Sequence, residues 1–146
     1  MEHQYETVAH RWFNEVWNQG RSEAIDELLA GDCIVHGLAD ESGKEIHGPE
    51  RFKPFFENFR GAFPDIHITV EDTVVEGDKV AAPCTVRATP TGEGIGVAPT
   101  NLPVTFTGIC IVRTQGDKVV EAWNNFDFMT MFQQLGVVNS AATPGV

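Results

Sequence analysis

The sequence predicts a single α+β domain in which N-terminal helices cover one face of a curved antiparallel sheet. In the first half of the chain, apolar residues recur at steps of three and four, as on one face of a helix. From Ile66 onward they alternate in steps of two, as in strands with one buried face. The length of 146 residues, without a repeat or linker, suits one domain over residues 1–138 and a frayed tail over residues 139–146.

Three helices are expected in the first half. The first ends at Gly20, and its apolar face comprises Tyr5, Val8, Ala9, Trp12, Phe13 and Val16. Ser22 can cap a short second helix, which an extended piece over residues 33–36 follows. Pro49 suits the first turn of the third helix. That helix carries an aromatic stripe, which is typical of a core rather than of a cofactor site: Phe52, Phe55, Phe56, Phe59 and Phe63.

The second half has the pattern of a meander. The expected strands cover residues 66–71, 79–89, 104–114 and 118–126, and a short helix over residues 128–135 follows them. Gly77-Asp78 and Gly116-Asp117 are predicted to form tight turns. We expect the Gly- and Pro-rich loop over residues 90–103 to border the mouth of a pocket and to adjust to a ligand. A pocket remains wherever helices do not fill the curve of such a sheet.

Composition excludes several classes of protein. Hydrophobic residues make up 42% of the chain, yet no apolar run approaches the length of a membrane span, and the N-terminus does not resemble a signal peptide. We therefore expect a cytoplasmic protein that does not contact a membrane. The net charge of −11 argues against binding to nucleic acid. The three cysteines are far apart, so neither a disulfide framework nor a metal site is expected.

The last strand carries the residues best suited to chemistry. If residues 118–127 are extended, Trp123, Asn125 and Asp127 share one face, whereas Asn124 lies on the other. A carboxylate beside an indole in an apolar pocket should have a raised pKa and could exchange protons near neutral pH. Alternatively, Asp127 caps the helix that starts at Phe128.

Other side chains are weaker candidates. His36 ends an extended segment and could transfer protons at a pocket mouth. Trp12 and Phe56, on the apolar faces of two helices, are expected to contact a substrate, as is Arg87 if it is buried with a carboxylate partner. An exposed Arg87 would be an ordinary surface charge.

Several short motifs occur along the chain in an order that is characteristic of one protein family. They are Phe63-Pro64-Asp65, Val70-Glu71-Asp72, 76–80 (EGDKV), Pro99-Thr100, 104–109 (VTFTGI), Glu121-Ala122-Trp123 through Asp127, and 133–136 (QQLG). In this order they resemble the SnoaL-like polyketide cyclases of the nuclear transport factor 2-like superfamily, over roughly residues 5–138. The resemblance implies a cone-shaped sheet around helices and a deep apolar pocket. It also implies intramolecular aldol condensation of a polyketide ester without metal or cofactor, a homodimer, and Asp127 as the acid/base residue.

One departure leaves the substrate and the reaction open. Many relatives carry a histidine after the threonine that matches Thr89, and this chain has Pro90 there. An epoxide hydrolase of the limonene-epoxide type is an alternative on the same fold, although Thr89 stands where that family has an aspartate. A dehydratase, a ketosteroid-type isomerase and a non-catalytic binding module also remain open. The predicted outer sheet face carries Val75, Ile109 and Ile111, which suit a dimer contact.

Overall fold

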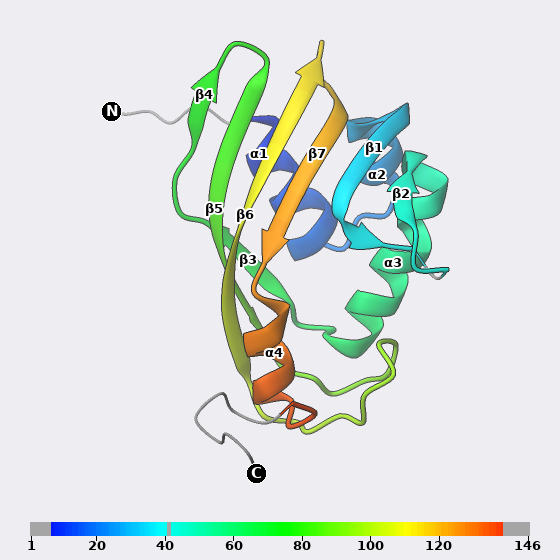
Figure 1. The fold of residues 1–146 in the computed structure, drawn as a ribbon, viewed down its shortest axis with the longest axis vertical. Helices are drawn as coiled ribbons and strands as arrows, with labels where there is room; N and C mark the ends of the chain where they lie inside the picture. The colour runs from blue at the N-terminus through cyan, green and yellow to red at the C-terminus, as the bar shows by residue number, and fades with distance from the viewer. Residues whose placement is uncertain (1–6, 41, 139–146) are drawn as a thin grey trace.

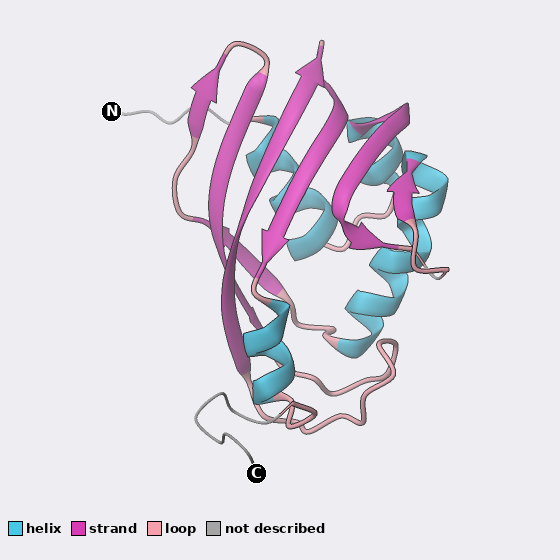
Figure 2. Ribbon diagram, in the orientation of Figure 1, coloured by secondary structure: helices cyan, strands magenta, loops and turns pink. Residues whose placement is uncertain are grey.

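The computed structural model describes residues 7–40 and 42–138, and confirms the α+β fold class with a curved, unclosed sheet. The N-terminal helices lie on one side of this sheet, behind the strands in the view of Figures 1 and 2, and the C-terminal helix lies at the lower end of the sheet. The strands are β1 (Leu29–Ala39), β2 (Glu45–His47), β3 (His67–Val70), β4 (Val74–Glu76), β5 (Lys79–Ala88), β6 (Val104–Gln115) and β7 (Lys118–Phe126). The helices are α1 (Val8–Arg11), η1 (Trp12–Asn18), α2 (Glu23–Leu28), α3 (Gly48–Ala62) and α4 (Phe128–Gln134). The predicted tail over residues 139–146 lies outside the described residues.

The first helical segment is α-helical for one turn and then π-helical. Thr7 caps it in a reciprocal pair with His10, in which Thr7 Oγ1 accepts from the backbone N–H of His10. The segment over Trp12–Asn18 then forms the π-helix η1. Its last residue, Asn18, joins the helix to β3, because its amide donates to the carbonyl of Ile68 and accepts from the N–H of Ile68. The helix is thereby fixed against the sheet.

The sheet follows the strand order β2-β1-β7-β6-β5-β3, and β4 pairs with β5. Gly77 and Gly116 adopt φ of +58° and +64° at the two predicted hairpin turns, a region that favours glycine. One pairing differs from the predicted antiparallel sheet, because β1 and β7 run parallel. No hairpin links these two strands, so their direction is not imposed by a tight turn.

The aromatic stripe of α3 is buried against η1, as predicted for a core. Phe52, Phe56, Phe59 and Phe63 are between 0% and 9% exposed. The Trp17 ring lies within 6.2 Å of four of the phenylalanine rings on α3, measured between ring centroids: Phe52, Phe55, Phe56 and Phe59. These aromatic contacts hold the helices together above the sheet. Within the described part of the chain, no helix is long and apolar enough to cross a membrane.

Candidate active site

A deep cavity lies between η1, α3 and the inner face of the sheet. It offers about 60 Å³ to the centres of water molecules. Most of its lining is aromatic or aliphatic, and the residues are Trp12, Phe13, Trp17, Leu29, Val35, Leu38, Phe52, Phe55, Phe59, Ile66, Ile68, Val86, Phe106, Cys110, Val119, Ala122, Asn124, Phe126 and Phe128. The cavity is therefore suited to an apolar ligand.

Asn124 supplies the one side-chain amide among the described residues that line this deep cavity. Its Nδ2 donates a 3.1 Å hydrogen bond to the carbonyl of His36 on β1. Within the described chain its Oδ1 has no protein partner, so it can accept a hydrogen bond from a ligand. The described lining contains no carboxylate and no imidazole.

Two glycines shape the wall around Asn124 and Phe126. Gly37 adopts a φ of +89°, and a Cβ there would lie 1.9 Å from the backbone oxygen of Asn124. Only glycine lets β1 approach β7 so closely. Gly108 pairs with Phe126 across β6 and β7, and a Cβ at Gly108 would lie 2.3 Å from the Phe126 ring. This missing side chain leaves room for the Phe126 ring in the cavity wall.

The structure corrects the predicted inward face of β7. Trp123 and Asn125 do not line the cavity. Asn124 does line it, although the strand alternation had placed Asn124 on the face opposite the predicted site. The indole of Trp123 instead stacks on the His36 ring on the outer face of the sheet, with centroids 5.5 Å apart. Asn125 is exposed on the same face.

The cause is a β-bulge at Val120. Arg113 pairs with Glu121 and the next residue of β6, Thr114, pairs with Val119, so Val120 is left over. An extra residue in one strand shifts its two-residue alternation by one. Val119 faces the cavity before the bulge, and Ala122 faces it after the bulge. No simple sequence signal marks this position.

Asp127 caps α4, which was the alternative reading of this residue. Its Oδ1 accepts a 3.0 Å hydrogen bond from the backbone N–H of Thr130, and its Oδ2 accepts a 2.6 Å bond from the Thr130 hydroxyl. These bonds, the hydroxyl first, hold the pKa of Asp127 below its usual value. The expected raised pKa is therefore wrong, because the carboxylate is exposed and hydrogen-bonded. Its two chain neighbours, Phe126 and Phe128, nevertheless line the cavity.

His36 lies outside the cavity. One ring nitrogen is 2.7 Å from Glu121, and the other contacts Glu45. The hydrogen bond with Glu121 raises the pKa of His36, and Glu45 contributes in the same direction. Arg113 also donates to Glu121, at 3.0 Å. The four residues and Trp123 form a polar cluster on the outer face of the sheet.

The other residues predicted to contact a substrate lie in different parts of the structure, and only some of them line the cavity. Trp12 lines the cavity, as expected. Phe56 is 5% exposed but packs against Trp17 without lining the cavity. Arg87 is exposed and pairs in register with His67 and Thr105, so it does not join Asp127 in a buried set. Sequence reasoning had assigned Phe55 and Phe59 to the core alone, yet both line the cavity as well.

The three cysteines are buried free thiols. Cys110 lines the cavity, and burial raises its pKa well above its usual value. Burial also raises the pKa of Cys84 to about 12. Neither thiol is set up as a nucleophile near neutral pH.

A second, outer hollow opens beside the deep cavity. It offers about 390 Å³ to water centres and is lined by Ala39, Asp40, Phe55, Asn58, Phe59, Gly94 and Ile95. Gly94 and Ile95 belong to the loop over residues 90–103, which reaches across to the C-terminal end of α3 (Figure 1). Backbone contacts hold this loop on α3, since a Cβ at Gly94 would lie 2.1 Å from the carbonyl oxygen of Asn58. The loop thus borders the outer hollow.

Comparison with known proteins assigns the family. A family model described as SnoaL-like polyketide cyclase matches residues 7–135. The chain belongs to the SnoaL-like polyketide cyclase family. Comparison with curated proteins gives no significant match.

Solved structures of similar fold include several SnoaL-like proteins. IdmH of Streptomyces antibioticus, a proposed polyketide cyclase, is 31% identical with a TM-score of 0.75, over 89% of this chain and 96% of that one. AclR of Streptomyces galilaeus, a proposed hydroxylase, is 28% identical with a TM-score of 0.74, over 88% of this chain and 79% of that one. A proposed SnoaL-like cyclase of Jannaschia sp. CCS1 reaches a TM-score of 0.78 over 94% and 99% of the two chains, but at 19% identity it supports the fold alone.

Proposed function

We propose that this SnoaL-like protein closes a ring in a polyketide-like ester by intramolecular aldol condensation. The observation that carries the proposal is the position of Asp127 between two phenylalanines, Phe126 and Phe128, that line an apolar cavity. Membership of a cyclase family supports an enzyme of the isomerase or lyase type. His36 is not included in the mechanism, because its ring lies on the outer face of the sheet.

Asp127 acts first as a base, because its lowered pKa keeps it ionised at neutral pH. The carboxylate removes a proton from a carbon next to a substrate carbonyl. The resulting enolate carbon forms a bond to a second carbonyl carbon of the same molecule, whose C=O π bond breaks. The new alkoxide oxygen then takes the proton from Asp127, so the residue returns to its starting state and no outside reactant is needed.

Two neighbours complete the proposed mechanism. A ligand that turns Asp127 away from Thr130 removes the bonds that lower its pKa, and the carboxylate becomes a stronger base. Asn124 holds the substrate in the cavity through its amide, which carries an unpaired Oδ1 and a second N–H. The amide can bind a hydroxyl or a carbonyl of the bound molecule.

Product analysis tests the proposal. The protein is incubated with methyl esters of short polyketides, and chromatography with mass spectrometry follows the loss of the linear ester and the appearance of a cyclic isomer of the same mass. We expect the cyclic isomer with the wild-type protein and not with Asp127→Asn. Cyclisation that survives in a folded Asp127→Asn variant would overturn the assignment of Asp127.

One observation favours a second candidate, a non-catalytic module that binds a small apolar molecule. No carboxylate, imidazole or amine lines the deep cavity in the described chain, and burial raises the pKa of the Cys110 thiol so that it stays neutral. The same product analysis separates the two candidates, because a binding module leaves the ester unchanged.

We also propose a homodimer through the outer face of the sheet. Ile109 is 49% exposed there and Ile111 is half-buried, whereas Val75 pairs with Val80 and therefore lies on the opposite face of the sheet, contrary to the prediction. Apolar residues exposed together on a sheet face are typical of an interface.

A further inference from the structure

His36 is connected to the deep cavity through its backbone, although its ring lies on the outer face of the sheet. Its carbonyl oxygen accepts the 3.1 Å hydrogen bond from Nδ2 of Asn124. This bond fixes the rotation of the Asn124 amide, whose Oδ1 is left without a protein partner among the described residues. The position of the His36 carbonyl therefore determines where Asn124 presents its Oδ1 in the cavity wall.

The pairing of β1 with β7 ends at His36. The parallel register runs from Ile34, opposite Glu121, to His36, opposite Trp123. Gly37 follows with a φ of +89°, which departs from strand geometry. The end of a strand pair is where the two backbones separate most easily. The contacts of the His36 side chain therefore decide how firmly this end of β1 is held.

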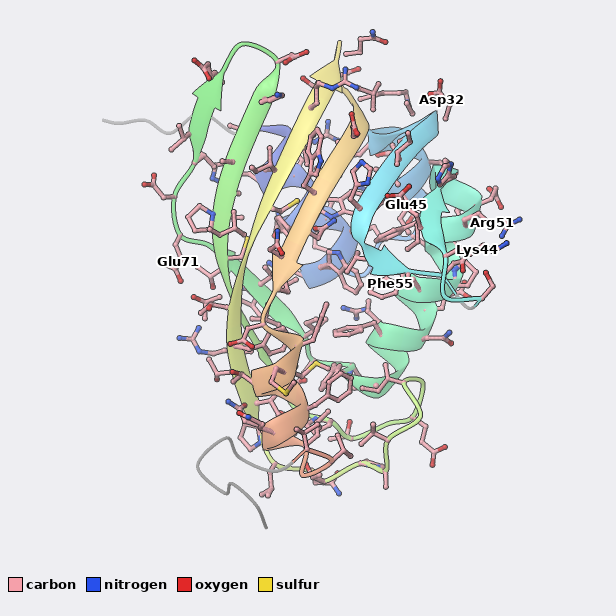
Figure 3. The ribbon with its side chains drawn as sticks, in the orientation of Figure 1. Asp32, Lys44, Glu45, Arg51, Phe55 and Glu71 are labelled. Carbon is pink, nitrogen blue, oxygen red and sulfur yellow. The ribbon has the colours of Figure 1, made fainter. Side chains whose placement is uncertain are left out.

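The His36 ring links three adjacent strands on the outer face. One ring nitrogen lies 2.7 Å from Oε2 of Glu121 on β7, and the other contacts Glu45 on β2. Glu45 lies where β2 runs beside β1 (Figure 3). The ring also stacks on the indole of Trp123, with centroids 5.5 Å apart. We call these contacts of His36 with Glu45, Glu121 and Trp123 the clamp, because they hold the end of β1 from both sides.

The clamp is complete only when His36 is protonated. An imidazolium donates from both ring nitrogens, whereas a neutral imidazole has one N–H and one lone pair. A neutral His36 therefore turns a lone pair toward one of the two carboxylates, and that hydrogen bond is lost. The hydrogen bond with Glu121 raises the pKa of His36 from its ordinary value of 6.5, and Glu45 contributes in the same direction. The clamp thus weakens as the pH rises through this higher value.

Three further basic side chains lie beside the clamp, from β6, β5 and β2 respectively: Arg113, Lys79 and His47. Arg113 donates to Glu121 at 3.0 Å, and His47 lies 3.3 Å from Oε1 of Glu45. Lys79 lies 5.9 Å from the centroid of the stacked indole. Histidine is the one residue type among the three that changes its charge near neutral pH. His47 is therefore the group that has to be tested beside His36.

We infer that His36 is a positioning residue of the candidate site: its ring holds the end of β1 on the outer face, and its carbonyl thereby orients the Asn124 amide in the cavity. The inference rests on the proposed function, in which Asn124 binds the substrate, and adds a residue that touches no substrate. Because the acceptor is a backbone carbonyl, a substitution at His36 keeps the acceptor and acts only through the position of β1.

Nuclear magnetic resonance tests the inference without any turnover. The side-chain NH₂ signals of Asn124 are assigned by their loss in Asn124→Ala, and are then followed with pH together with the ring signals of His36. We expect the NH₂ signals of the wild-type protein to shift with the midpoint of His36, above pH 6.5, because a weaker clamp moves the carbonyl to which the amide donates. NH₂ signals that stay constant while His36 titrates would overturn the inference.

Two variants of His36 and one control identify the group that titrates. His36→Arg keeps a cation that donates to both carboxylates at every pH, so the Asn124 signals should stay constant at their low-pH position. His36→Gln lacks the cation, so the signals should stay constant at their high-pH position. His47→Gln is the matched control, because His47 contacts Glu45 from β2 and not from β1, and it should keep the wild-type midpoint.

The outcomes of this comparison decide for or against the inference. Asn124 signals that still titrate in a folded His36 variant, or that lose their titration in His47→Gln, would overturn it. If neither His36 variant folds, the wild-type titration and His47→Gln decide, because the ring signals of His36 give its midpoint directly.

Turnover extends the test to the reaction. His36→Gln should lower the kcat for a polyketide methyl ester by less than the loss of about 10²-fold expected for Asn124→Ala, because the amide is displaced and not removed. In the Asn124→Ala background, His36→Gln should have no further effect. An equal fold-loss from His36→Gln in both backgrounds would show that His36 does not act through Asn124.

The inference and the proposed function fail separately. If the protein cyclises no ester while the Asn124 signals follow His36, the enzyme proposal is refuted and His36 still positions the amide of a binding site. If the protein cyclises an ester while the Asn124 signals are independent of His36, the enzyme proposal stands and the positioning role is refuted.

Discussion

The hydroxyl of Thr130 donates a 2.6 Å hydrogen bond to Oδ2 of Asp127, and the two residues also share the cap of α4. The carboxylate of Asp127 is therefore both the N-cap of α4 and the proposed base. Substitutions at either residue therefore separate a structural role from a catalytic one.

Asp127→Asn keeps the size and much of the capping ability of the side chain but removes its titratable proton. We expect turnover of a polyketide methyl ester to fall by about 10²- to 10⁴-fold while the melting temperature changes little. Thr130→Val is the companion variant, because loss of the hydroxyl should raise the pKa of Asp127 and shift the acidic limb of the rate profile to higher pH. A small molecule that is turned over equally by Asp127→Asn and wild type would assign this residue to capping alone.

Asn124→Ala tests the amide of the cavity wall. The variant should turn over a polyketide methyl ester about 10²-fold more slowly, because the amide no longer binds the substrate or stabilises charge that develops on its carbonyl. Loss of the bond to the His36 carbonyl should cost about 0.5–1.5 kcal/mol of unfolding free energy. Asn125→Ala is the matched control on the outer face. Equal loss of turnover in both variants would argue against a role inside the cavity.

Gly37→Ala should disturb the contact of β1 with β7. Its φ of +89° alone costs an alanine about 1–2 kcal/mol. Gly43→Ala, with φ of +82° and open space around its Cβ position, carries only that cost. We expect denaturant unfolding to show an additional loss of about 1–3 kcal/mol at Gly37, because its Cβ meets the backbone of Asn124. Equal losses would mean that the strands separate without cost.

The outer cluster gives the stability a pH dependence. The raised pKa of His36 means that its contribution is complete below 6.5 and is lost as the pH rises through the higher value of the folded state. The pKa values of Glu45 and Glu121 are lowered, so their contributions are present above 4.5 and are lost at more acidic pH. The cluster therefore stabilises most between about 4.5 and 6.5.

Melting curves of His36→Gln check this expectation. Between pH 5.5 and pH 8.5, the wild-type melting temperature should fall further than that of His36→Gln. His67→Gln, an exposed histidine of β3, should behave as the wild type does. Parallel curves for wild type and His36→Gln would show that solvent screens the cluster completely.

The proposed dimer predicts that wild-type protein scatters light as a pair of chains at micromolar concentration. Ile109→Asp places a charge on the outer face and should yield monomers. Leu102→Asp is the control, because Leu102 is 64% exposed in the loop before β6. A wild-type protein that is monomeric at this concentration would rule out the dimer.

The fold could be predicted because its main features are local. Glycine turns at Gly77 and Gly116 and the aromatic stripe of α3 determine where strands reverse and where helices pack. The parallel pairing of β1 with β7 depends on contacts between distant segments, and no local pattern reports it. A pattern of apolar residues at steps of three and four also does not predict that η1 is a π-helix rather than an α-helix.

The site was predicted less well, and one residue accounts for much of the difference. Val120 bulges out of β7, so the alternation that should have placed Trp123 in the cavity places Asn124 there. The lowered pKa of Asp127 has a separate origin, since exposure and hydrogen bonding depend on the tertiary structure and not on the strand pattern.

The burial of Cys110 makes its thiol a probe of how often the deep cavity opens to solvent. A thiol-specific reagent can modify Cys110 only while the cavity is open to solvent and the thiol ionises, so its modification rate measures how often the cavity opens. Cys33 and Cys84 are buried without lining that space, and they report on wider unfolding instead. In a variant whose single cysteine is Cys110, the labelling rate would measure how often the deep cavity opens. Slower labelling in the presence of a small molecule would show that the molecule binds in the cavity, without any assay of turnover.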